Sequence, residues 1–300
     1  MKFAIVESVV TPGGHEIDYD RILVEELSAL GHEVEFYVPE GHEFKWNYGV
    51  PVYKLKGQGI SYKGAKGLKK LYLSIKRELN RQKWYKQILK HAKNGDFDAI
   101  IFPSATYRYL RALSKSELKN SPVPIIFLIH GLTPKESIRL KEYANEFNSY
   151  ENVKVGIQSF AEEKLGINTD NVKFFYPPNY IPRDIIISDN KNKELKLGFF
   201  GQYRKEKKLD DFLDVYIKCE FKIPVKLIVQ GATQTEADEK DFTRIINKYS
   251  KYSNIEFLHK ALIGVEWQKG LASVDTLVMP YGNDRYLYHT SAILSNAIGF

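Results

Sequence analysis

The chain has 300 residues, 43% of them apolar, which is typical of a globular protein with a sizeable core and excludes disordered and fibrous classes. No apolar run reaches the roughly 18 residues that a membrane span needs, and the first residues, which include Glu7, do not form a secretory signal, so we expect a cytoplasmic protein. Cys219 is the only cysteine, which excludes an intrachain disulfide and a thiolate zinc site.

The formal net charge of +7 has a local origin. Residues 63–93 contain eleven lysines and arginines but only one acidic residue, Glu78. Within this segment apolar residues recur at helical spacing, which predicts one or two basic amphipathic helices. Their apolar side either packs into the core or faces anionic lipid headgroups or a polyanionic substrate. Nucleic acid is the less favoured partner, because no recognition motif accompanies the basic run.

Apolar runs rich in Val, Ile and Phe alternate with helical patterns along the chain. The predicted strands are residues 2–9, 33–38, 98–103, 124–129 and 152–157, then 195–200, 225–229, 254–258 and 275–280. Continuous apolar strands that alternate with helices indicate parallel sheets covered on both faces. The predicted fold class is therefore α/β and doubly wound.

Regular structure is interrupted over residues 176–194, where three prolines precede a polar run. Prolines oppose helix continuation, and a polar run has little to bury. We therefore predict two domains, residues 1–183 and 184–300, with the boundary near residue 184.

The segment 198–210 carries the strongest functional pattern in the chain. An apolar strand ends at Gly201, Gln202 follows, and Arg204 and Lys207 are expected to open the next helix. A glycine turn lets backbone N–H groups approach an anion, and two cations on the first helical turn can reach its oxygens. The pattern predicts a phosphate site, and its alternative interpretation is a set of solvated charges at a helix start.

Other glycine and polar residues also follow predicted strands, at the edge where parallel sheets bind ligands. They are Gly13 and Gly14 after the first strand, His130 after the fifth, Gly231 and Tyr281 in the second domain, and Thr290 and Ser291 before the last helix. Two of these patterns have plain structural alternatives: a diglycine is a common tight turn, and a lone histidine is often a satisfied core residue.

Together these segments resemble the GT-B glycosyltransferases, and within them the large retaining group called family 4. The most specific part is the run from Phe199 to Asp210, which resembles the strand, glycine, Arg and Lys segment of that family. The resemblance implies two Rossmann-like domains that face each other across a cleft. It also implies transfer of a sugar from a UDP- or GDP-linked donor to a hydroxyl of a glycan or a lipid-linked acceptor, as in the synthesis of cell-surface polysaccharides, with no cofactor and no metal.

Individual roles follow from the same resemblance. Arg204 and Lys207 would bind the diphosphate, Gly13 and Gly14 would lie beside it, and His130 would lie near the donor sugar. The late motif places Tyr288 and Asn296 where the family usually has two glutamates, and Asn296 retains the ability to bond a ribose hydroxyl.

The family continues beyond the motif at which this chain ends, so we expect a short second domain. Two other activities stay open from the residues alone. One is a non-catalytic subunit that binds a nucleotide-sugar or a glycan and supports a partner enzyme, and the other is a nucleotide-sugar epimerase. The basic segment 63–93 adds an expected peripheral contact with an anionic membrane at its inner face.

Overall fold

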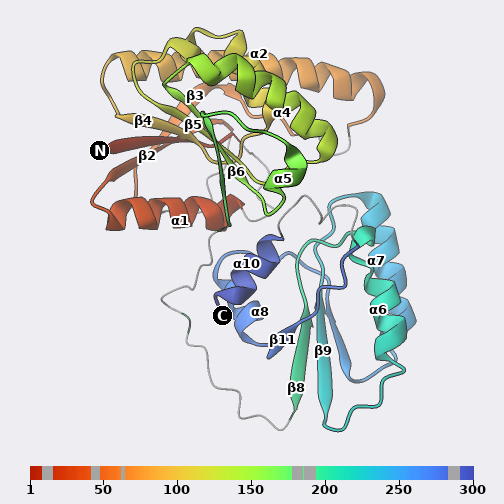
Figure 1. Cartoon of the computed structure of the whole chain (residues 1–300). Coiled ribbons are helices and arrows are strands. Elements are labelled where there is room, and N and C mark those ends of the chain that lie inside the picture. Colours follow the sequence, from red (N-terminus) through yellow and green to blue (C-terminus); the bar gives the residue numbers. More distant parts are fainter. Residues whose placement is uncertain (9–15, 42–47, 62–64, 178–184, 186–193, 283–290) are drawn as a thin grey trace. The chain divides into compact units, whose positions relative to one another are not determined.

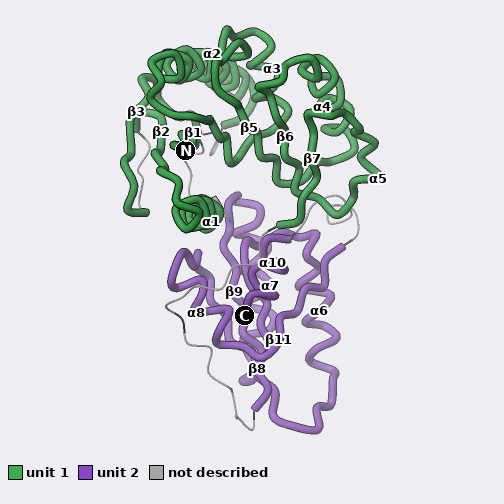
Figure 2. The backbone as a smooth tube through the Cα atoms, turned by 60° about the vertical axis from the view of Figure 1, so that its left-hand side comes forward, with its two compact units in different colours: residues 1–177, 288–290 green, residues 178–287, 291–300 purple. Residues whose placement is uncertain are grey.

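The structure is a computed structural model that describes residues 1–8, 16–41, 48–61, 65–177, 185, 194–282 and 291–300. The described residues form two compact units. Unit 1 is built from those of residues 1–177, and unit 2 from those of residues 185–300 (Figure 2). The predicted boundary near residue 184 lies in a stretch of which only Ile185 is described, so it stays a prediction.

Unit 1 contains a parallel sheet of seven strands in the order β3-β2-β1-β4-β5-β6-β7 (Figure 1). The strands are β1 (Lys2–Val6), β2 (Glu33–Glu40), β3 (Val52–Gln58), β4 (Ala99–Phe102), β5 (Ile125–Ile129), β6 (Val153–Gln158) and β7 (Val172–Phe175). Five of them confirm predicted strands. The predictions missed β3 and β7, which form the two edges of the sheet.

Helices cover both faces of this sheet. They are α1 (Glu16–Ala29), α2 (Gly67–Lys93), α3 (Tyr107–Ser114), α4 (Pro134–Glu146) and α5 (Glu162–Leu165), with 3₁₀ turns η1 (Glu117–Asn120) and η2 (Phe147–Ser149). Alternate strand residues face opposite sides. Ile5 packs toward Val24 of α1, whereas Ala4 and Val6 belong to the core that α2, α3 and α4 close. Residues 67–93 of the basic segment form one continuous helix, α2.

Helix α2 is fixed to the edge strand β3 by side-chain hydrogen bonds. The Gln87 amide accepts from the Lys56 backbone N–H at 2.9 Å and donates to the Lys56 carbonyl at 3.1 Å. The Trp84 indole donates to the Gly57 carbonyl at 3.1 Å, and Asn80 donates to the Gln58 carbonyl at 2.7 Å. Backbone groups of the edge strand thus have partners in the second half of α2.

Unit 2 contains a parallel sheet of four strands in the order β10-β9-β8-β11. The strands are β8 (Leu195–Phe199), β9 (Val225–Gln230), β10 (Ile255–Leu258) and β11 (Thr276–Leu277). The helices are α6 (Leu209–Tyr216), α7 (Glu236–Tyr249), α8 (Val265–Ala272) and α10 (Ala292–Ile298). Helices α6 and α7 close a core with Phe199, whereas α8 and Ile293 of α10 pack on the other side with Phe200. Both sheets are therefore parallel and doubly wound, as predicted.

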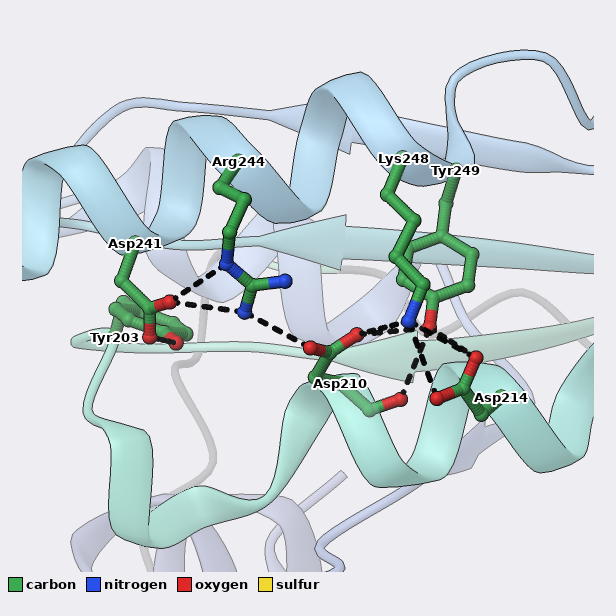
Figure 3. A network of polar contacts seen from close by, with 7 residues as sticks. All are labelled: Tyr203, Asp210, Asp214, Asp241, Arg244, Lys248 and Tyr249. Atoms are coloured by element: carbon green, nitrogen blue, oxygen red, sulfur yellow. Dashed lines mark hydrogen bonds and ion pairs between the residues drawn. The ribbon is translucent and has the colours of Figure 1, made fainter.

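A polar network joins α6 to α7 (Figure 3). Arg244 bonds Asp210 at 2.8 Å and Asp241 at 2.9 Å, and Lys248 bonds Asp210 at 3.0 Å. The Tyr203 hydroxyl donates to Asp241 at 2.6 Å, so the same network holds the loop that follows β8. Through Tyr203, residues of α7 therefore hold the loop that precedes α6 in place.

The network makes the stability of unit 2 sensitive to acid. Burial would raise the pKa of Asp210, but hydrogen bonds from Tyr249, Lys248 and Arg244 outweigh it and lower that pKa from 3.8 to about 2. A depressed pKa in the folded state gives stability that is present above the unfolded value and lost as the pH falls through the folded one. We expect the unfolding free energy of the wild type to fall from about pH 4 to about pH 2. In Asp210→Asn the unfolding free energy, measured by urea unfolding, falls less over this pH range. An equal fall in the wild type and in the variant would contradict this role of Asp210.

Candidate functional site

Strand order reverses between β8 and β11 in unit 2, and open parallel sheets bind ligands at the carboxyl edge of such a switch point. Gly201 follows β8 there, with a φ of 106° that L-residues rarely adopt. A Cβ on Gly201 would lie 2.5 Å from Ile293 Cδ1 and 3.3 Å from Lys207 Nζ. The glycine, the lysine ammonium and the first turn of α10 therefore meet at one point.

Lys207 is a buried cation at this point, with 3% of its surface exposed. Its Nζ lies 5.8 Å from the centre of the Phe199 ring and 5.1 Å from that of Tyr281. Desolvating an ammonium is costly, and aromatic faces offset part of that cost. The segment after β11 is tied to the same turn, since the Gly282 N–H donates to the Glu206 carbonyl at 3.0 Å. The predicted residues Gly201, Lys207 and Tyr281 are thus brought together.

Arg204 lies in the same loop and is held by its neighbours. Its Nη2 donates to Gln202 Oε1 at 3.1 Å, and its Nη1 lies 3.8 Å from a Glu206 carboxylate oxygen. The helix expected to open at Arg204 begins later. Residues 205–207 form the 3₁₀ turn η3, and α6 starts only after Lys208, whose φ of 52° is left-handed and separates the two.

The backbone N–H groups of Gly201 and Gly231 have partners within the protein, whereas the sequence predicted a glycine turn whose N–H groups approach an anion. The Gly201 N–H donates to Gln230 Oε1 at 2.8 Å, and the Gly231 N–H donates to the Leu258 carbonyl at 3.1 Å. Both amides are therefore engaged within the protein. Packing explains why position 231 is a glycine, because a Cβ there would lie 2.5 Å from the Phe242 ring.

Gln230 is a site residue that the sequence predictions missed. It is almost fully buried at the end of β9, and its amide also donates to the Lys260 carbonyl, so it links the ends of β8, β9 and β10. Its signal in the sequence is a polar residue directly after the apolar run of residues 227–229.

The remaining predicted residues of unit 2 lie on or beside α10. Ser291 is the N-cap residue of α10 by its extended backbone, but its side chain makes no capping hydrogen bond. Asn296 is half-buried on the same helix. Thr290 and Tyr288 lie outside the described residues, as do Gly13 and Gly14 of unit 1.

His130 follows β5 in unit 1, at the carboxyl edge of that sheet. Its Nδ1 pairs with the Gln158 side-chain oxygen at 2.8 Å, and its Nε2 lies 2.6 Å from the Pro103 carbonyl. Tyr19 packs edge-on against the ring at 4.5 Å. Both partners are oxygens that only accept, so a neutral ring donates to one of them at a time. The imidazole joins the ends of β4, β5 and β6, and it would have to release a partner before it exchanged a proton.

In the part of the chain that the structure describes, no three His, Cys, Asp or Glu side chains gather as metal ligands would. No helix among the described segments has the length and hydropathy that a membrane span requires.

No family model and no curated protein sequence matches this chain. Solved structures do match. Anabaena HepE in complex with UDP is 16% identical at a TM-score of 0.60, over 93% of this chain and 74% of its own. The catalytic domain of starch synthase IV from Arabidopsis thaliana, bound to ADP and acarbose, is 11% identical at 0.63, over 94% and 78%. WaaG, a glycosyltransferase involved in lipopolysaccharide biosynthesis, is 14% identical at 0.55, over 93% and 74%. Likeness at these identities establishes the fold, and this chain therefore has the GT-B fold with two Rossmann-like domains.

Proposed function

We propose that the chain is a glycosyltransferase that moves a sugar from a UDP- or GDP-linked donor to a hydroxyl of a glycan or lipid-linked acceptor. The observation that carries the proposal is the buried Lys207 ammonium beside Gly201 at the switch point of unit 2, with Arg204 in the same loop. The solved structures add support, since HepE has been solved with UDP and with UDP-glucose.

The chemistry needs positive charge at this position. Cleavage of the bond between the sugar and the diphosphate builds negative charge on the leaving group, and fixed cations in a water-poor site stabilise that charge by several kcal/mol. Lys207 is already desolvated, so little reorganisation is needed when the charge develops. In this proposal Arg204 and Lys207 neutralise the diphosphate without a metal or a cofactor.

Further roles in the proposal come from the remaining predicted residues. Gly13, Gly14, Gln202, Gly231 and Tyr281 would line the donor phosphates, while Thr290, Ser291 and Asn296 would contact the phosphates or the ribose. His130 would contact the donor sugar through its ring or its backbone, with Gln158 and Pro103 fixing the orientation of the ring.

The test separates binding from turnover. We expect calorimetric titration to detect binding of UDP or GDP, and the protein to hydrolyse the corresponding nucleotide-sugar slowly without an acceptor. Inorganic phosphate and uridine serve as ligand controls. Binding without any turnover would favour the non-catalytic subunit, and no binding of either nucleotide would contradict the proposal.

The acceptor is proposed to be anchored at an anionic membrane. In that case the protein works from the cytoplasmic side and meets the bilayer through residues 63–93, whose charge suits anionic headgroups.

A further inference from the structure

Helix α2 has different surroundings along its length. Its buried side chains all lie in the second half of the helix, which packs toward β3, α3 and η1. They are Asn80, Arg81, Trp84, Tyr85, Ile88, Leu89 and Ala92. The first half, residues 67–79, contributes no buried side chain. The second half therefore anchors α2 in unit 1, whereas no side chain of residues 67–79 is buried against the described residues.

The first half carries an apolar row on one side. The row consists of Leu68, Leu71, Tyr72, Ile75 and Leu79, which are spaced three and four residues apart, and each is 54–85% exposed. An apolar side that packed into the protein core would be buried, as the apolar residues in the second half of α2 are. The core alternative for this part of the basic segment is therefore wrong.

The same side of the helix continues as a basic surface. Seven residues beyond Leu79 comes Lys86, followed at spacings of four and three by Lys90 and Lys93, and all three are exposed. We call these three residues the lysine row. One continuous outward side of α2 is therefore apolar over its first half and basic over its second.

The start of α2 also favours a negative surface. The N-cap residue Lys66 makes no side-chain capping bond, and the first turn contains no acidic residue but holds Lys69 and Lys70. The N-terminus of a helix carries partial positive charge, so cations there are unfavourable and nearby anions are favourable.

We propose that residues 67–79 lie in the interface of an anionic membrane, with the apolar row inserted and the lysine row against the headgroups. This rests on the proposed membrane contact of segment 63–93 and narrows it to one side of one helix. A basic helix with one apolar side binds in the plane of the interface, and each basic residue near anionic lipid strengthens that binding.

A second copy of the chain fits the same surface poorly. Parallel pairing of two α2 helices would bring the lysine rows together, and antiparallel pairing would bury the apolar row of one copy against the lysines of the other. Both arrangements lose free energy through repulsion or through desolvation of charge.

The test is flotation of the full chain with vesicles of phosphatidylcholine alone or mixed with phosphatidylglycerol. We expect retention by the mixed vesicles that weakens as salt rises. Replacing both Lys86 and Lys90 by Gln lowers the partition coefficient about thirtyfold, and replacing both Leu71 and Ile75 by Gln lowers it at least about tenfold. The matched controls Leu30→Gln and Lys218→Gln/Lys222→Gln change exposed side chains elsewhere and leave retention unchanged.

The shift of melting temperature by UDP and by GDP is measured on every variant, so loss of the fold or of the donor site is seen separately from loss of lipid binding. If the protein bound vesicles but no nucleotide, this inference would stand and the proposed function would be contradicted. Absence of retention, equal retention by neutral vesicles, or wild-type retention of either α2 variant overturns the inference.

Discussion

Lys207→Ala is expected to reduce turnover of the nucleotide-sugar about 100- to 1000-fold, the loss seen when one preorganised group that stabilises developing negative charge is removed. The ammonium of Lys207 is buried near two aromatic rings and beside Gly201, so water cannot replace it with equal effect. Affinity for UDP or GDP should fall as well, because the free diphosphate carries the charge that the leaving group develops. Steady-state kinetics and calorimetry measure the two losses.

The matched control for this variant is Lys205→Ala. Lys205 belongs to the same 3₁₀ turn and carries the same charge, but its side chain is exposed. Solvent screens the effect of the Lys205 charge on the diphosphate, so we expect turnover and nucleotide affinity to change by about threefold or less. Equal losses in Lys205→Ala and Lys207→Ala would show that only the net charge of the turn matters and would remove the special role of Lys207.

Gly201→Ala is expected to destabilise unit 2 and to abolish nucleotide binding together. The backbone of Gly201 has a left-handed φ of 106°, and the new methyl group would lie 2.5 Å from Ile293 and 3.3 Å from the Lys207 ammonium. Strain of the backbone and overpacking add up to about 2–5 kcal/mol of unfolding free energy. Because the Ile293 side chain and the Lys207 ammonium have to shift, the site is lost even in molecules that remain folded. Urea unfolding and calorimetry measure the two effects.

Gly166→Ala provides the control for backbone strain. Gly166 also has a positive φ, 61°, but nothing lies within 4 Å of the position of its Cβ. We expect a loss of about 1 kcal/mol and unchanged nucleotide binding, since only the left-handed conformation is penalised. If Gly201→Ala behaved like Gly166→Ala, the close approach of Ile293 and Lys207 to Gly201 would not matter for stability or nucleotide binding.

Much of the fold could be predicted because its central strands are buried on both faces and appear as continuous apolar runs. The edge strands of unit 1 lack that signal. In β3 the residues Lys54 and Lys56 are exposed and only Leu55 is buried, so the pattern resembled a loop. The first half of α2 was ambiguous for a related reason, since helical spacing of apolar residues is the same whether the core or something outside the protein covers them.

The candidate site was predicted by residue type but not by detailed geometry. The pattern after β8 identified Gly201, Arg204 and Lys207, yet the left-handed Lys208 that delays α6 carries no sequence signal, because lysine rarely adopts that conformation. Gln158 and Gln230 were missed because their importance depends on which strand ends are neighbours. Only the strand order shows that one holds His130 and the other holds the Gly201 amide.

The hydrogen bonds between Gln87 and Lys56 have a consequence for self-association. An edge strand with open N–H and carbonyl groups invites another chain to pair with it, which leads to aggregation. In β3 the Gln87 side chain occupies both backbone groups of Lys56 in the manner of a neighbouring strand, and the Trp84 indole occupies the next carbonyl. The helix thereby protects its own sheet against intermolecular β-pairing, a safeguard that matters for a chain with exposed apolar side chains elsewhere.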